Sequence, residues 1–194
     1  MIIFVGISRV IDRKHLRKAC RAIERIRPKF LLTDLIGNDL VSTEKQAEKK
    51  IKTAKDGTQV DPRYNLEIYK LAEVICKRGD VIGIDYDFMN GWEDLQQYRK
   101  DKRMFRKREI NLMLNIQEFV KKHRNEKNII VLVNDDHIRS DGETLTNEFG
   151  KSKILARIEK LKLPFVVYRY SDVRTKEAEE LVQLISLLDT EDYL

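Results

Sequence analysis

Ionisable side chains follow a short apolar run at five places in the chain. These places are Ser8-Arg9, Asp34, Asp85-Tyr86-Asp87, Asn134-Asp135-Asp136-His137 and Arg169-Tyr170-Ser171-Asp172. If each run is a strand of one parallel sheet, the five places meet at its carboxyl edge, where ligands bind in open α/β folds. Helix capping explains an occasional Asp after a strand, but capping does not require ionisable groups at all five ends. We therefore expect a functional cleft lined by Arg9, Asp34, Asp85 and His137.

His137 is the residue of this group that can move a proton near neutral pH, because an unperturbed imidazole titrates there. It directly follows two carboxylates, Asp135 and Asp136. The other two histidines, His15 and His123, fall within predicted helices, where structural or solvated roles are expected. His137 is therefore the predicted general acid or base, and a histidine in a surface turn is the alternative.

The carboxylates at the strand ends allow a second interpretation, an oxygen cage for Mg²⁺. The cage would draw on Asp34, Asp85, Asp87, Asp135 and Asp136. It would suit a Mg²⁺-dependent phosphoesterase or nuclease. However, the D-x-D pair follows the third apolar run, whereas the haloacid dehalogenase pattern places it after the first. A divalent metal held by Asp85, Asp87, Asp135 and Asp136 is therefore the alternative and not the leading hypothesis.

Several nucleotide-binding and hydrolytic motifs are missing from the sequence. It has no G-x-x-x-x-G-K-[ST] phosphate loop, and no G-x-G-x-x-G follows the first apolar run. It also has no G-x-S-x-G nucleophile elbow. These absences argue against a P-loop hydrolase, a dinucleotide-binding domain and an α/β-hydrolase with a serine nucleophile.

The elements that must position these residues alternate along the chain. Apolar runs predict strands at residues 2–7, 30–35, 81–84, 129–133 and 165–168. Apolar residues three and four apart predict helices at about residues 12–27, 61–79, 92–123 and 154–161 and from residue 172 onward. Residues 42–60 are predicted to be a mobile or helical insertion. We expect a single three-layer α/β domain over residues 1–194, with a mostly parallel sheet of at least five strands flanked by helices.

The composition favours a folded protein with a strongly ionised surface. Of the 194 residues, 42% are hydrophobic and 36% are charged, and the net charge is +6. No apolar run approaches the roughly 20 residues of a membrane-spanning helix, and the N-terminus lacks the features of a secretory signal. Cys20 and Cys76 fall on predicted helices and are expected to be buried thiols. We therefore expect a cytoplasmic protein that does not contact membranes.

Residues 99–108 form a basic segment with seven basic residues and one acidic residue. Such a segment can bind the phosphates of a nucleic acid through counterion release. No aromatic interleaving or known nucleic-acid motif accompanies it, however. We favour solvation, or pairing with the acidic residues 177–192 of the same or a neighbouring chain, over a nucleic-acid partner. The sequence leaves a homo-oligomer open.

The order of the motifs resembles the superfamily that contains TraB/PrgY, EreA, ChaN and Tiki proteins. Its members begin with a strand ending in G-x-x-H-V, and residues 6–10 here read GISRV. A strand ending in Glu-Leu follows in the family, as Asp34-Leu35 does here, and then a strand ending in I-D-R-D, where residues 84–87 read IDYD. A helical R-D-x-x-M motif matches residues 108–112, REINL, and a second G-x-x-H matches residues 134–137, NDDH. The likeness covers residues 2 to about 138.

The departures from the family pattern change the chemistry that this resemblance implies. Tiki-like members bind a divalent metal through both histidines and the Glu, but Arg9 replaces the first histidine here, and a guanidinium has no lone pair to give a metal. The resemblance then implies a divergent hydrolase-like protein with a site for a small anionic ligand. Its catalytic residues would be His137, Asp34 and Glu109, and its ligand-binding residues would be Arg9, Arg108 and Asp85. A non-enzymatic relative that binds an anion or a partner protein is the third hypothesis.

Overall fold

The computed structural model describes residues 1–7, 13–37, 39–55, 62–85, 102–134, 137–138 and 153–169. Its strands are β1 (Ile2–Ile7), β2 (Phe30–Thr33), β3 (Leu40–Val41), β4 (Asp80–Gly83), β5 (Ile129–Asn134) and β6 (Phe165–Arg169). Its helices are α1 (Arg13–Ile26), α2 (Glu44–Lys55), α3 (Pro62–Ile75), α5 (Lys102–Lys122) and α6 (Lys153–Lys160). No helix within these ranges combines the length and the apolar character needed to cross a membrane.

The strands form one six-stranded sheet in the order β3-β4-β2-β5-β1-β6. Every neighbouring pair is parallel except β3 with β4, which is antiparallel. The expected α/β domain with a mostly parallel sheet is confirmed. The two-residue edge strand β3 was not predicted, because Leu40 and Val41 form a run too short to stand out in the sequence.

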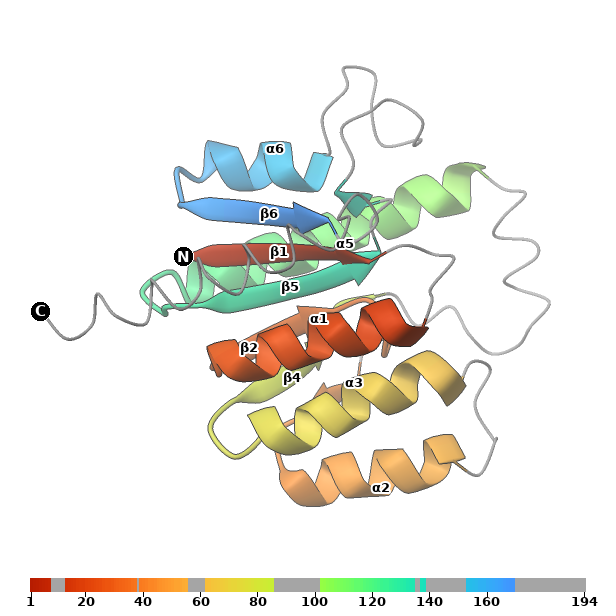
Figure 1. Ribbon diagram of the computed structural model, residues 1–194. Coiled ribbons are helices and arrows are strands. Elements are labelled where there is room, and N and C mark those ends of the chain that lie inside the picture. Colours follow the sequence, from red (N-terminus) through yellow and green to blue (C-terminus); the bar gives the residue numbers. More distant parts are fainter. Residues whose placement is uncertain are drawn as a thin grey trace, which may run out of the picture.

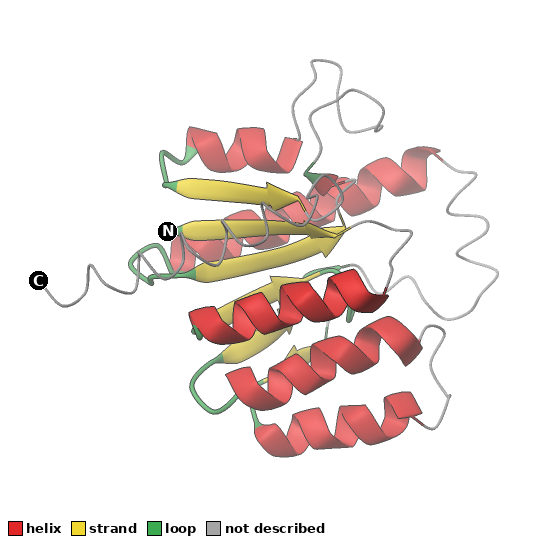
Figure 2. Ribbon diagram, viewed as in Figure 1, coloured by secondary structure: helices red, strands yellow, loops and turns green. Residues whose placement is uncertain are grey.

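Helices cover both faces of the sheet, which gives three layers (Figures 1 and 2). Alternate residues of β1 point to opposite faces, as the pleat of a strand requires. Ile3, Val5 and Ile7 pack with the apolar sides of α1, α2 and α3, whereas Ile2 and Phe4 pack with those of α5 and α6. Strand β1 is therefore buried from two sides, which is why its sequence is apolar without alternation.

Residues 44–55, within the segment predicted to be a mobile or helical insertion, form helix α2. Thr43 and Gln46 begin it with a capping box, in which the Gln46 N–H donates to Thr43 Oγ1 at 3.2 Å and the Thr43 N–H donates to Gln46 Oε1 at 3.2 Å. Ala47, Ile51 and Ala54 are buried on its inner side. Because the buried residues are few and small, the helix was hard to distinguish from a solvated segment by its sequence.

The loop after β2 is tied to the end of β4 by backbone hydrogen bonds. The Gly83 N–H donates to the Asp39 carbonyl at 2.6 Å, and the Asp85 N–H donates to the Gly37 carbonyl at 3.0 Å. Gly37 takes a φ of +63°, and a Cβ added to Gly83 would lie 2.3 Å from the Gly37 oxygen. The absence of a side chain at Gly83 thus lets the loop cross β4 closely and fixes the position of Asp85 relative to Asp34.

Candidate functional site

Three neighbouring strands bring the predicted site residues to one edge of the sheet. In the sheet, β2 lies between β4 and β5. Asp34 directly follows β2, Asp85 comes two residues after β4, and His137 comes three residues after β5. Their meeting is a consequence of parallel pairing, because the carboxyl ends of the three strands then lie side by side.

Asp34 lies at the centre of this group, because its strand, β2, lies between β4 and β5. The backbone N–H of Asn134 donates to Asp34 Oδ1 and Oδ2, both at 3.3 Å. His137 Nε2 lies 3.1 Å from Asp34 Oδ2, and Arg108 Nη2 lies 3.7 Å from the same oxygen. Burial acts to raise the pKa of Asp34, but the hydrogen bond and charge of His137, the charge of Arg108 and the Asn134 N–H together hold it below its usual value. Asp34 is therefore held as a carboxylate.

Arg108 pairs with Asp85 along one side of its guanidinium. Arg108 Nε lies 2.7 Å from Asp85 Oδ1 and 2.8 Å from Oδ2, and Arg108 Nη2 forms an ion pair with Oδ2. Helix α5 places Arg108 there because it packs Leu112, one turn later, into the core against the sheet. Arg108 therefore points inward to a carboxylate, whereas its neighbour Lys107 is exposed.

The four side chains pack against one another and are almost closed off from solvent. Their exposed fractions are 0% for His137, 2% for Asp34, 10% for Asp85 and 15% for Arg108. We call Asp34, Asp85, Arg108 and His137 the buried quartet. Three of the four residues expected to line one cleft, Asp34, Asp85 and His137, therefore lie together. They form a closely packed cluster and not the lining of an open cleft. Two carboxylates face one guanidinium, so a protonated His137 would bring the quartet to neutrality.

One contributor was missed in the sequence. Asn115 Nδ2 donates to the Ile84 carbonyl at 2.8 Å and so fastens α5 to the chain just before Asp85. Asn115 lies seven residues after Arg108, with Leu112 between them at a spacing of four, so the three share one face of the helix. The spacing of Asn115 from Arg108 and Leu112, which both point inward, was the sequence signal that could have identified its role.

Other predicted site residues lie outside the part of the chain that the structure describes. They are Arg9, Asp87, Asp135 and Asp136, together with the side chain of Glu109. Among the described residues, no three His, Cys, Asp or Glu side chains gather in a way that could hold a metal ion. Both oxygens of Asp85 accept from Arg108. A cation bound to Asp85 would therefore have to compete with a guanidinium.

The two cysteines are unsuited to act as nucleophiles. Both are free thiols, with Cys20 buried in α1 and Cys76 half-buried just after α3. Burial, helped by the charges of Glu67 and Glu24, raises the pKa of Cys20 to about 12. Burial also raises the pKa of Cys76 to about 11, and Cys76 Sγ donates to the Val41 carbonyl at 3.0 Å. Both thiols therefore stay protonated near neutral pH.

Comparison of the chain with protein-family models, with curated proteins and with solved structures gives no significant match. The resemblance to the TraB-like superfamily therefore rests on the order of the sequence motifs alone.

Proposed function

We propose that this chain is a hydrolase-like protein, divergent from the TraB/EreA/ChaN-like superfamily, that binds a small anionic ligand at the carboxyl edge of its sheet. One observation carries the proposal: four ionisable side chains from three strand ends and a helix are buried together at the edge where α/β proteins bind ligands. Burying ions costs free energy, and apolar residues of the same volume often stabilise a fold as well or better. A role in catalysis or ligand binding accounts for the presence of four buried ionisable side chains at this edge of the sheet.

In this proposal, His137 is the general acid or base and Asp34 is its positioning residue. The 3.1 Å contact between Asp34 Oδ2 and His137 Nε2 sets the orientation of the imidazole. The Asn134 N–H holds the carboxylate from the other side. An Asp–His pair of this kind can supply a proton to a leaving group or accept one from a water molecule.

Arg108 is the proposed anion-binding residue. It is the most exposed member of the buried quartet, so an incoming ligand would meet it first. Asp85 occupies the side of the guanidinium formed by Nε and Nη2 and fixes its plane. A guanidinium held in this way can bind a phosphate or carboxylate with little loss of side-chain freedom.

A non-enzymatic binding protein is the second candidate, favoured by how completely the quartet is packed. All four side chains are at most 15% exposed and already have partners within the cluster. Such a cluster can serve as a rigid support for an anion without any bond being broken. The Mg²⁺-dependent phosphoesterase has less support, since Asp85 is committed to Arg108.

Hydrolysis assays with matched variants test the proposal. The purified chain is assayed on p-nitrophenyl phosphate and p-nitrophenyl acetate, with and without Mn²⁺. Replacing His137 by Gln should lower the turnover of a hydrolysed substrate by about 10²–10⁴-fold, the usual contribution of a general acid or base. Replacing the exposed Lys107 by Gln, one residue before Arg108, should leave the rate unchanged. Circular dichroism confirms that each variant is folded.

The same assays separate the alternatives. Turnover that requires Mn²⁺ and survives His137→Gln would favour the metal-dependent phosphoesterase. No turnover, but thermal stabilisation by inorganic phosphate that is lost in Arg108→Lys, would favour the binding protein. Neither turnover nor stabilisation would reduce the buried quartet to a structural cluster and overturn the proposal.

A further inference from the structure

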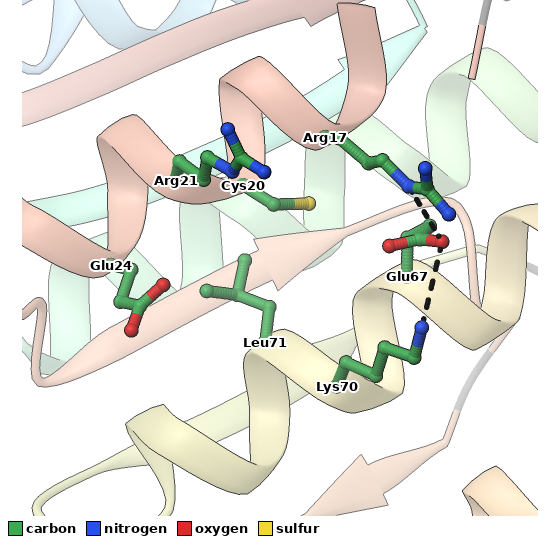
Figure 3. Close-up of a pocket in the computed structure, with 7 residues that line it drawn as sticks. All are labelled: Arg17, Cys20, Arg21, Glu24, Glu67, Lys70 and Leu71. Carbon is green, nitrogen blue, oxygen red and sulfur yellow. Dashed lines mark hydrogen bonds and ion pairs between the residues drawn. The ribbon is translucent and has the colours of Figure 1, made fainter. Parts of the chain in front are cut away.

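A second candidate site lies between α1 and α3 and is built from other residues than the buried quartet. It is a solvent-open pocket of about 240 Å³ (Figure 3). Its lining residues are Arg17, Cys20, Arg21, Glu24, Glu67, Lys70 and Leu71. A pocket of this size suits a small ion or a short organic acid.

A buried carboxylate fixes one end of this α1–α3 pocket. The side chain of Glu67 is 8% exposed, and it accepts from Arg17 Nε at 3.1 Å. Lys70 Nζ lies 3.8 Å from the same oxygen (Figure 3). Arg17 of α1 is therefore anchored to the buried acid of α3. The buried Glu67 carboxylate thus holds one cation from each helix, Arg17 of α1 and Lys70 of α3.

The charges that line the pocket leave an excess of positive charge. Arg21 follows Arg17 by four residues on α1 and therefore shares its face. Arg17, Arg21 and Lys70 face two carboxylates, of which Glu67 is already shared by two of the cations. Between the charged groups lie Leu71 and the neutral thiol of Cys20, which supply an apolar wall.

We propose that the α1–α3 pocket is a second anion-binding site, specific for a small oxyanion such as a phosphate or carboxylate group. Arg17 and Arg21 would bind its oxygens through their planar guanidinium edges, and Lys70 would add a point charge. The site is independent of the function proposed for the strand ends, because the two sites share no residue.

Calorimetric titration with inorganic phosphate and, separately, with succinate tests this site at constant ionic strength. Replacing Arg21 by Gln should weaken the binding of the preferred anion about tenfold, the effect of losing one charge-assisted hydrogen bond. Lys70→Gln should act in the same direction. The matched control is Arg25→Gln, which removes an equal charge from the exposed surface of the same helix one turn later, outside the pocket.

The outcomes separate this site from the strand ends. A preference for phosphate over succinate would identify a phosphate ligand, and the reverse would identify a dicarboxylate. Equal weakening by Arg21→Gln and Arg25→Gln would mean that only net charge matters and would overturn the proposal. It would also be overturned if neither anion binds at millimolar concentration, or if only Arg108→Lys weakens binding.

Discussion

Asp34 joins the buried quartet to two strands and a helix. Its carboxylate accepts from the Asn134 N–H of β5. Its Oδ2 lies near His137 Nε2, beyond that strand, and near Arg108 Nη2 of α5. Without these partners, burial would favour the neutral acid. Because the partners reverse that tendency, the charge on Asp34 depends on the folded structure, and the folded structure in turn depends on that charge.

Truncating Arg108 tests how far the fold relies on the quartet. Arg108→Ala leaves Asp85 and Asp34 buried without their cation and should lower the free energy of unfolding by about 2–4 kcal/mol. Lys107→Ala removes an exposed charge from the same helix turn and should cost less than about 0.5 kcal/mol. Urea titrations of both variants measure the difference. Equal losses would show that Arg108 is not held as the structure has it.

Asp34 should also make stability depend on pH in the acidic range. Its pKa is lowered in the folded state from the ordinary value of 3.8, so the unfolded chain binds the proton more readily. The stabilisation is therefore complete above the unfolded pKa and is lost as the pH falls through the folded one. Urea titrations between about pH 6 and pH 3 should show a shallower loss for Asp34→Asn than for the natural chain.

The control for this measurement is Glu118→Gln, which neutralises an exposed carboxylate on α5 and should keep the slope of the natural chain. A slope unchanged by Asp34→Asn would mean that the ionisation of Asp34 is not coupled to folding.

At the scale of elements, α5 and the loop between β2 and β3 give the site its shape. Helix α5 connects β4 to β5, and its inner residues pack on the face of the sheet that carries Leu32 of β2. It therefore passes from the strand that precedes Asp85 to the strand that precedes His137. Residues 37 and 39 of the loop bond to β4 and to Asp85 beyond it. The geometry of the quartet thus depends on two connections and not only on the strands.

A side chain at residue 83 should disturb this geometry. Gly83→Ala places a Cβ 2.3 Å from the Gly37 oxygen and 2.7 Å from the Asp39 nitrogen, both backbone atoms that cannot rotate away. We expect a loss of about 1–3 kcal/mol, as in other overpacked sites. Gly37→Asn, where an added Cβ meets nothing within 4 Å and Asn tolerates the positive φ, should cost less than about 1 kcal/mol. Thermal or urea unfolding of the two variants compares them, and equal costs would contradict the close crossing.

The elements with many apolar residues could be predicted from the sequence, and the smaller ones could not. Residues 2–7 and 129–133 are runs of large apolar residues that only a buried strand explains, and both are strands in one parallel pair. Asp34, Asp85 and His137 followed from reading the residues after such runs, whereas Arg108 followed from the motif resemblance at residues 108–112. Asn115 and β3 were missed because their roles depend on contacts across the fold, to Ile84 and to β4, that no local pattern records.

At the scale of the whole molecule, the fold turns one cation of the basic segment at residues 99–108 away from the surface. It carries seven basic residues and one acidic residue, and so accounts for as much net charge as the whole chain. Arg108, however, turns inward to Asp85 with its side chain 15% exposed, whereas Lys107 faces solvent. One of the seven cations is therefore turned inward and is withdrawn from the exposed face of α5, where a nucleic acid would bind.

We accordingly expect no specific role for nucleic acid. A fluorescence anisotropy titration of labelled duplex DNA at low salt should show no binding in the micromolar range. Binding through about four phosphates would instead weaken with salt along a double-logarithmic slope of about −3.6. Lys107→Gln would then lower the magnitude of that slope by about 0.9, because it removes one exposed cation. Arg108→Lys would leave the slope unchanged, because this cation already forms an ion pair with Asp85. Micromolar binding with that pattern would overturn the expectation and make the exposed face of α5 a further functional surface.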